Sequence, residues 1–162
     1  MVTSESNLQQ CLDEAYRYLS YRPRSEGEMR QRLRQRGYDS DTVESAISRL
    51  REQNLSNDLA FATFWKESRL SSRPRSRRLI QRELSEKKVA PEIREQVTSD
   101  IDDEANACRL GRSRMRTLAH LDYPHFHRRL RNYLGYRGFS YEVIRHTIAL
   151  LWRERENQQV KH

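Results

Sequence analysis

Arginine is the residue of this sequence best able to do chemistry with a partner. The 162 residues include 31 Lys and Arg, four of which are Lys, so that 27 are Arg. Asp and Glu number 23, which gives a formal net charge of +8. Because the guanidinium group is planar, always charged and shaped for phosphate and carboxylate, this excess favours a polyanionic or acidic partner. The alternative explanation of the many arginines is that the protein is encoded by a GC-rich genome, which uses Arg where another genome uses Lys.

The densest basic cluster lies between residues 71 and 88, where two Glu oppose seven cations. The cations are Arg73, Arg75, Arg77, Arg78, Arg82, Lys87 and Lys88. Those from Arg73 to Arg78 fall before or within the first turn of an expected helix, where positive charge opposes the helix dipole. This electrostatic cost favours a binding role, and changing Arg75, Arg77 and Arg78 together to Ala should weaken binding without loss of helicity.

Two other regions carry candidate contact residues. Arg30 and Arg34 lie on one flank of an apolar helical stripe, and Arg32 and Arg36 lie on the other. A second patch in the last third of the chain contains Arg112, Arg114, Arg116, Arg128, Arg129 and Arg131. Each region is either a solvated face or a surface that binds phosphate or an acidic protein.

Five tyrosines could stack on the bases of a single strand, although we expect most of them to be buried or partly buried. They are Tyr18, Tyr21, Tyr123, Tyr133 and Tyr136.

Motifs for catalysis are missing from the sequence. It has no Gly-rich phosphate loop, no G-x-S-x-G and no H-E-x-x-H. Cys11 and Cys108 form no C-x-x-C pair, and the five His do not complete a metal set with them. We therefore expect no enzyme, no metal and no cofactor, and two unpaired thiols in a reducing cytoplasm.

The chain also lacks the patterns of targeting segments. Its first ten residues, MVTSESNLQQ, are polar, and no apolar run approaches the roughly 20 residues that span a bilayer. We expect a cytoplasmic protein with no membrane partner.

A repeat with a period near fifty residues organises these candidates. Gly37, Lys88 and Gly138 are anchors spaced 51 and 50 residues apart, and a leucine lies four residues before each. A basic residue directly precedes each anchor, which suits the negative end of a helix dipole. Self-similarity of this kind is typical of a helical repeat array.

Each repeat contains three helical patterns. In the first repeat, Leu12, Ala15 and Leu19 form one apolar stripe, Met29 and Leu33 a second, and Val43, Ile47 and Leu50 a third. Ser25 and Glu28 make a capping box before the second stripe. We expect an all-α fold of nine helices without strands, in three repeats that cover residues 7–54, 55–101 and 102–156.

The middle repeat departs from its neighbours at the anchor. Lys88 replaces glycine, and a left-handed conformation costs a non-glycine residue roughly 1 kcal/mol. One residue is also missing after this anchor, so we expect this turn to have a different shape.

The order of motifs resembles the RecX family, regulators of the RecA recombinase. The residues that match are Ala15–Leu19, Arg22–Glu28, Leu33, Gly37, Leu50, Leu55, Asn57, Asp58, Phe61 and Ala62, followed by RRLRNYLGYRGFSYEVI in the third repeat. The resemblance covers about residues 11–155. It implies tandem three-helix repeats in an elongated, curved array.

The resemblance also implies a function in the control of DNA repair, recombination and the SOS response. A RecX protein binds in the groove of the RecA filament on single-stranded DNA and dampens its ATPase, strand-exchange and co-protease activities. The resemblance also implies weak binding to duplex DNA, and we expect a monomer. The alternatives are a sequence-specific, duplex-binding helix-turn-helix regulator and, on the isoelectric point alone, a protein associated with RNA or the ribosome.

Overall fold

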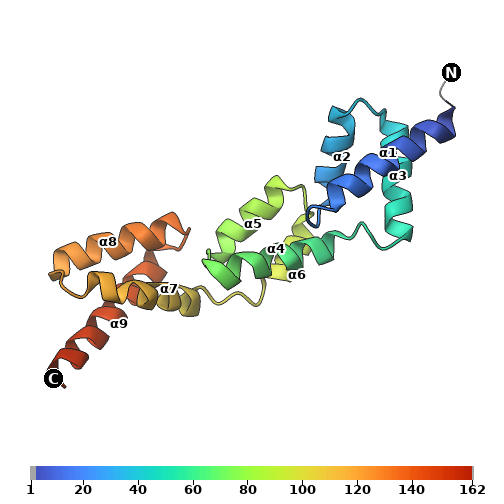
Figure 1. Ribbon diagram of the computed structural model, residues 1–162. Helices are drawn as coiled ribbons and strands as arrows, with labels where there is room; N and C mark the ends of the chain where they lie inside the picture. Colours follow the sequence, from blue (N-terminus) through green and yellow to red (C-terminus); the bar gives the residue numbers. More distant parts are fainter. Residues whose placement is uncertain (1–2, 162) are drawn as a thin grey trace. The chain divides into compact units, whose positions relative to one another are not determined.

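The computed structural model describes residues 3–161, and this part of the chain folds into nine α-helices without a strand (Figure 1). The all-helical prediction is therefore confirmed. The helices are α1 (Ser4–Leu19), α2 (Glu26–Gln35), α3 (Ser40–Glu52), α4 (Asp58–Ser72), α5 (Arg77–Glu86), α6 (Pro91–Thr98), α7 (Asp103–Leu118), α8 (Tyr123–Tyr136) and α9 (Tyr141–Val160).

The chain divides into two compact units. The first unit contains the residues up to Lys66 together with Glu83–Val97, and the second contains Glu67–Arg82 together with the residues from Thr98 onward. The division passes through α4 and α5, so the middle three-helix segment contributes to both units. The boundaries of the three sequence repeats stay a prediction.

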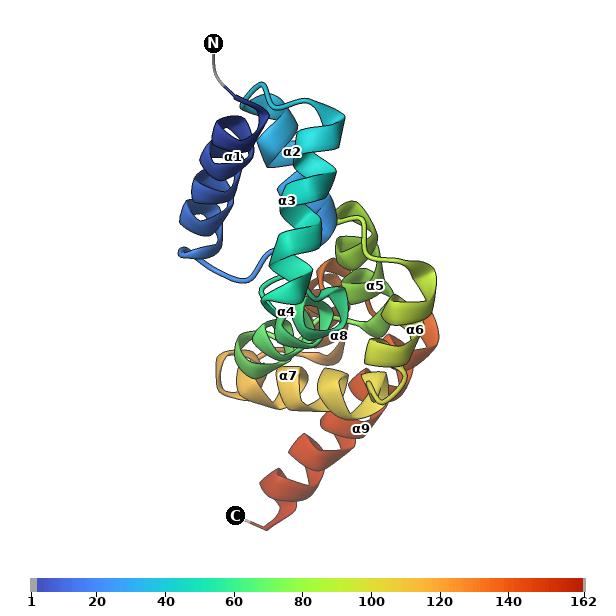
Figure 2. The same cartoon turned by 90° about the vertical axis from the view of Figure 1, so that its right-hand side faces the viewer.

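The first unit is built on α1, α2 and α3, which pack together (Figures 1 and 2). Their shared core contains Cys11, Leu12, Ala15, Met29, Leu33, Val43, Ala46, Ile47 and Leu50. Ser25 forms the predicted capping box with Glu28, and the Asp39 carboxylate accepts a hydrogen bond from the Thr42 amide at the start of α3 (2.7 Å). Burial of the amphipathic stripes thus holds together three helices that would be marginal alone.

The second unit has an equivalent core on α7, α8 and α9. Its fully buried members include Ala107, Phe126, Leu130, Leu134 and Leu151. Asp102, Asp122 and Ser140 cap the starts of the three helices. The last turns of α9 extend beyond α7 and α8 in both ribbon views (Figures 1 and 2).

The three anchor turns have the same hydrogen-bonding pattern. The amide of Gly37 donates to Arg34 and the next amide donates to Leu33, and the same two bonds recur at Lys88 and at Gly138. All three anchors have positive φ, 94° at Gly37, 63° at Lys88 and 87° at Gly138. The expectation that the Lys88 turn differs in shape was therefore wrong, because a lysine can adopt the left-handed conformation at modest cost.

Packing around the turn explains why lysine is accommodated at position 88. In the first unit the Lys88 Cβ lies where a side chain on Gly27 would be, only 2.3 Å from an ideal Cβ built there. The Ser25 hydroxyl also donates to the Lys87 carbonyl (2.6 Å), which holds the turn against the start of α2. In the second unit the glycine is on the turn, since a Cβ on Gly138 would lie 2.8 Å from the Leu79 Cβ. Each of the two contacts between an anchor turn and a helix start thus requires one glycine. In the first unit the glycine is at the helix start, and in the second unit it is on the turn.

We expect Gly27→Ala to lower the free energy of unfolding by about 1–3 kcal/mol through overpacking against Lys88. Adding Lys88→Gly should recover most of this loss, because it removes two of the three close contacts. Chemical denaturation of the single and double variants measures the coupling.

Gly135→Ala is the matched control for this cycle. Gly135 is helical and its Cβ would meet only Ile144, at 3.9 Å, so the change should stabilise the protein by about 0.5–1 kcal/mol. Equal losses for Gly27→Ala with and without Lys88→Gly would contradict the packing explanation.

Candidate nucleic-acid and partner interface

The candidate basic residues on α2 differ in their surroundings. Arg30 is held by two carboxylates, with its Nε 2.7 Å from Glu44 Oε1 and its Nη2 3.3 Å from Glu26 Oε2. The hydrogen bond from Arg30 lowers the pKa of the Glu44 carboxyl. Arg34, one turn further along the same helix, is exposed and forms no ion pair with any residue in 3–161. Arg34 is therefore the more available cation of the two.

Lys87 is part of a charged network inside the first unit. Its Nζ lies 3.0 Å from Glu28 Oε1 and 5.3 Å from the centroid of the Trp65 ring. Arg22 binds the same carboxylate and lies over the same ring, and the Trp65 indole N–H donates to Glu83 (2.9 Å). Lys87 thus makes structural contacts, whereas Lys88 remains exposed on the surface.

The cluster in the middle of the chain surrounds the start of α5. Arg73 and Arg75 lie in the turn before the helix, and Arg77 and Arg78 lie in its first turn. Arg73, Arg78 and Arg82 are exposed, whereas Arg75 and Arg77 are half-buried.

An acidic side chain offsets part of the expected charge conflict at this helix start. Asp103 Oδ1 accepts a hydrogen bond from the Arg77 amide (2.9 Å), and the Ser76 hydroxyl accepts one from the Leu79 amide. Asp58 makes the equivalent bond to the Glu26 amide at the start of α2 (2.9 Å). Burial raises the pKa of both aspartates. The local electrostatic argument for a binding role here is therefore weaker than the sequence suggests.

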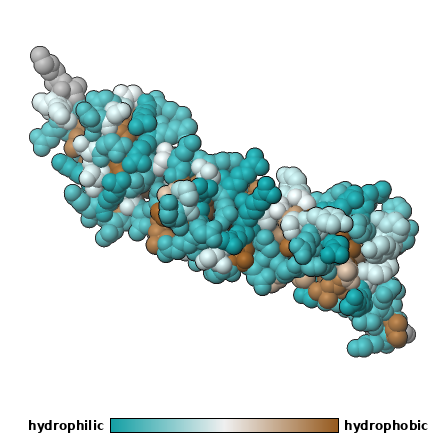
Figure 3. Space-filling view, turned by 180° about the vertical axis from the view of Figure 1, so that it is seen from behind, coloured by the Kyte–Doolittle hydropathy of each residue, from teal (hydrophilic) through white to brown (hydrophobic). Residues whose placement is uncertain are grey.

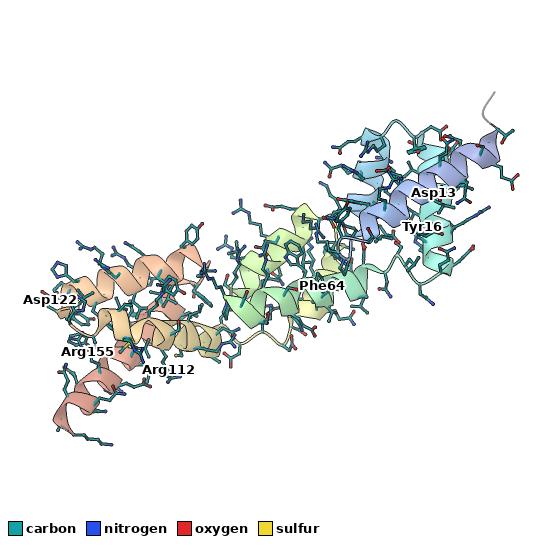
Figure 4. All side chains as sticks on the ribbon, viewed as in Figure 1. Asp13, Tyr16, Phe64, Arg112, Asp122 and Arg155 are labelled. Atoms are coloured by element: carbon teal, nitrogen blue, oxygen red, sulfur yellow. The ribbon has the colours of Figure 1, made fainter. Side chains whose placement is uncertain are left out.

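The third cluster lies on α7 and α8 of the second unit. Arg112 is committed to Glu154 of α9 through two bonds, of which the shorter joins Nη2 to Oε1 at 2.7 Å (Figure 4). Arg116, Arg128 and Arg131 are exposed and form no ion pair in the described part of the chain.

The structure brings Arg114 and Arg129 together from these two helices. Both line an open pocket of about 210 Å³, and the Arg114 guanidinium lies 4.4 Å from the centroid of the Tyr133 ring. Arg114, Arg129 and Tyr133 are all candidates from the sequence, but their spacing does not predict that they lie at one site. Their convergence depends on how α7 packs against α8.

The tyrosine prediction was wrong for most of its members. Tyr21, Tyr123 and Tyr136 are exposed, and only Tyr18 and Tyr133 are partly buried. Tyr21 lies in the turn after α1 and has no helical position at all, so helical spacing could not predict its exposure. Exposed rings are thus available for stacking in both units.

Cys11 is a buried thiol in the core of the first unit. Burial raises the pKa of the Cys11 thiol to about 11, so this thiol is protonated and inert at neutral pH. Among residues 3–161 no three His, Cys, Asp or Glu side chains are grouped to hold a metal ion. No helix in the same range is long and apolar enough to cross a bilayer, and the face drawn in Figure 3 is mostly hydrophilic with small apolar patches.

The fold defines a helical repeat protein, and comparison with known families identifies which one. Residues 11–50 match the first three-helix domain of RecX, residues 57–97 the second and residues 102–148 the third. The chain belongs to the RecX family of regulatory proteins, as the resemblance of its motifs predicts.

Individual relatives agree with this assignment. The regulatory protein RecX of Amycolatopsis mediterranei is 33% identical over 137 residues, which cover 80% of this chain and 78% of the relative. That of Prosthecochloris aestuarii is 31% identical over 145 residues, 90% of this chain and 95% of the relative. The crystal structure of RecX from Lactobacillus salivarius has a TM-score of 0.77 at 23% identity, covers 91% of this chain and 97% of that chain, and shows the same fold.

Proposed function

We propose that this protein binds the RecA filament on single-stranded DNA and mainly inhibits its ATPase, strand-exchange and co-protease activities. The observation that carries the proposal is the match of all three RecX domains, in order, along one chain. The protein would act as a cytoplasmic monomer in the control of DNA repair and recombination.

The distribution of cations supports this proposal. Arg34 in the first unit and Arg73, Arg78, Arg114, Arg116, Arg128, Arg129 and Arg131 in the second form no ion pair with a carboxylate of residues 3–161. Such cations can approach DNA phosphates or acidic protein without first breaking an intramolecular ion pair. Binding should therefore weaken as the salt concentration rises.

A sequence-specific duplex reader is the less favoured function. In a helix-turn-helix arrangement α3 would enter the major groove, yet its exposed face carries Asp41 and Glu44. Carboxylates on the reading face would repel the phosphates that line the groove. Tight selection of one duplex sequence would contradict our preference.

The direct test is the ATPase activity of RecA on single-stranded DNA. We expect this protein to inhibit that ATPase at micromolar concentrations, and the double variant Arg73→Gln with Arg78→Gln to inhibit several-fold less. These two arginines are exposed, so their loss should leave helicity unchanged. Arg75 and Arg77 are half-buried, which makes the triple variant with Arg78 a less clean probe.

A matched control removes the same charge elsewhere. Arg49 and Arg153 are exposed and lie outside the candidate clusters, so Arg49→Gln with Arg153→Gln should inhibit nearly as well as the unchanged protein. Equal inhibition by both double variants would mean that the middle cluster is a solvated face. No inhibition by the unchanged protein would refute the proposed function.

A further inference from the structure

The pocket between α7 and α8 has the composition of an anion site. Arg114, Thr117 and Leu118 line it from α7, and Arg129, Leu130 and Tyr133 line it from α8. Leu118 and Leu130 are buried and belong to the core of the second unit. The lining therefore combines two guanidinium groups, a hydroxyl and an aromatic ring, with no carboxylate.

Neither arginine of the pocket, Arg114 or Arg129, forms an ion pair with a carboxylate of residues 3–161. Neither α8 nor α7 beyond Glu104 contains an acidic residue. Asp122, which precedes α8, is occupied with the amide and the ring of His125 (Figure 4). Arg129 is exposed and forms no hydrogen bond or ion pair with residues 3–161, in contrast to Arg112, which pairs with Glu154. A cation without a partner gains most from an external anion.

Tyr133 holds Arg114 in place. The Arg114 guanidinium stacks at 4.4 Å from the ring centroid, and the buried Arg137 approaches the same ring at 5.7 Å. Stacking of this kind restricts the long Arg side chain before any ligand arrives, so less entropy is lost on binding. Tyr133 is thus a positioning residue for Arg114.

An exposed ring lies on the same side of α8 as Arg129. Tyr136 follows Arg129 by seven positions, which at 100° per residue places them about 20° apart around the helix and about 10 Å apart along it. The Tyr136 side chain is 85% exposed. A cation followed by an open aromatic ring suits the alternating phosphates and bases of a single strand better than it suits an acidic peptide.

We infer that this pocket binds a backbone phosphate of single-stranded DNA through Arg114 and Arg129, while Tyr136 stacks on a base further along the strand. The pocket is smaller than the roughly 300–1,000 Å³ that encloses a small-molecule ligand, so it accepts one group of a longer chain. The inference rests on the proposed function, because it assigns the DNA contact of the protein to the second unit.

Fluorescence anisotropy with a short labelled oligothymidylate tests this site in the full chain, without RecA. Arg129→Gln and Arg114→Gln should each raise the Kd by about five- to tenfold and reduce the slope of log K against log salt by about one. Arg112→Gln removes the same charge from α7 but from a residue paired with Glu154, so it should change the Kd by less than about twofold.

The aromatic variants separate the phosphate contact from the base contact. Tyr133→Phe keeps the ring under Arg114 and should bind like the unchanged protein, whereas Tyr133→Leu should match Arg114→Gln at unchanged helicity. Tyr136→Ala should weaken binding of oligothymidylate but not of inorganic polyphosphate, because only the former offers bases.

Two results would overturn the inference. Unchanged oligothymidylate binding by Arg114→Gln and Arg129→Gln would exclude the pocket as a phosphate site. If these variants lost binding to polyglutamate and kept it to oligothymidylate, the pocket would be a site for acidic protein. The anisotropy assay contains no RecA, so it reports on DNA binding alone. If this protein failed to inhibit the RecA ATPase, a measured loss of DNA binding in the pocket variants would still stand. A failure of the proposed function and a failure of this inference can therefore be told apart.

Discussion

Replacing Leu33 with alanine should lower the free energy of unfolding by about 2–5 kcal/mol. Leu33 is 0% exposed and belongs to the core that α1, α2 and α3 share. The loss combines the transfer energy of the removed atoms with the cavity they leave, which three short helices can collapse only in part. A single domain typically has 5–15 kcal/mol in total, so this variant should be severely destabilised.

Urea denaturation followed by fluorescence measures this loss within the affected unit. Trp65 lies in the first unit and Trp152 in the second, so single-tryptophan variants report on each unit separately. Leu33→Ala should shift the Trp65 transition to lower urea. Leu55→Ala is the control, since Leu55 is 47% exposed and its truncation should cost no more than about 0.5 kcal/mol. Equal effects of the two changes would contradict the assigned core.

Replacing Glu28 with alanine should cost about 3 kcal/mol at neutral pH. Glu28 is 8% exposed and binds Arg22, Lys87 and the amide of Ser25. Removing one partner of a buried charge network leaves the other charges without a partner. The expected loss of unfolding free energy lies at the low end of the usual range, because Arg22 and Lys87 each keep 29% exposure. Glu44→Ala breaks an exposed pair with Arg30 and should cost less than about 1 kcal/mol.

The effect of Glu28→Ala should depend on pH. Burial alone raises the pKa of the Glu28 carboxyl, but the hydrogen bonds from Arg22, Ser25 and Lys87 outweigh it and hold the pKa below its usual value. A lowered pKa in the folded state adds stability above the ordinary carboxyl pKa of about 4.3, and this stability is lost as the pH falls through the folded value. The gap between Glu28→Ala and the unchanged protein should therefore narrow in acid. A gap that stays constant down to low pH would contradict the ionic role of Glu28.

Much of the fold could be predicted from the sequence because its signals are local. Apolar spacing located the helices, the capping box at Ser25 and Glu28 marked the start of α2, and glycine marked the end of two helices. Comparison of the copies predicted the repeats, whose buried leucines Leu33, Leu84 and Leu134 are equivalent. The family followed from the same residues, since motif order and repeat period are both properties of the linear chain.

The Lys88 turn shows where local reasoning failed. The missing glycine and the residue missing after the anchor suggested a different shape. The absent side chain of Gly27, 61 residues away in the sequence, nevertheless leaves room for the lysine. Local conformational preferences cannot predict the contact between Lys88 and Gly27, because this contact forms only when the turn packs on the start of α2.

The candidate arginines divide in the same way. Their number and clusters are properties of the linear chain, as are the net charge, the spacing that predicts the nine helices of residues 3–161 and the motifs that identify the family. The packing of the helices fixes which cations are already paired, such as Arg30, Lys87 and Arg112, and which converge, as Arg114 and Arg129 do. The physical reason is that helix formation follows from neighbours three and four residues apart, whereas the partner of a long charged side chain depends on the packing of separate helices.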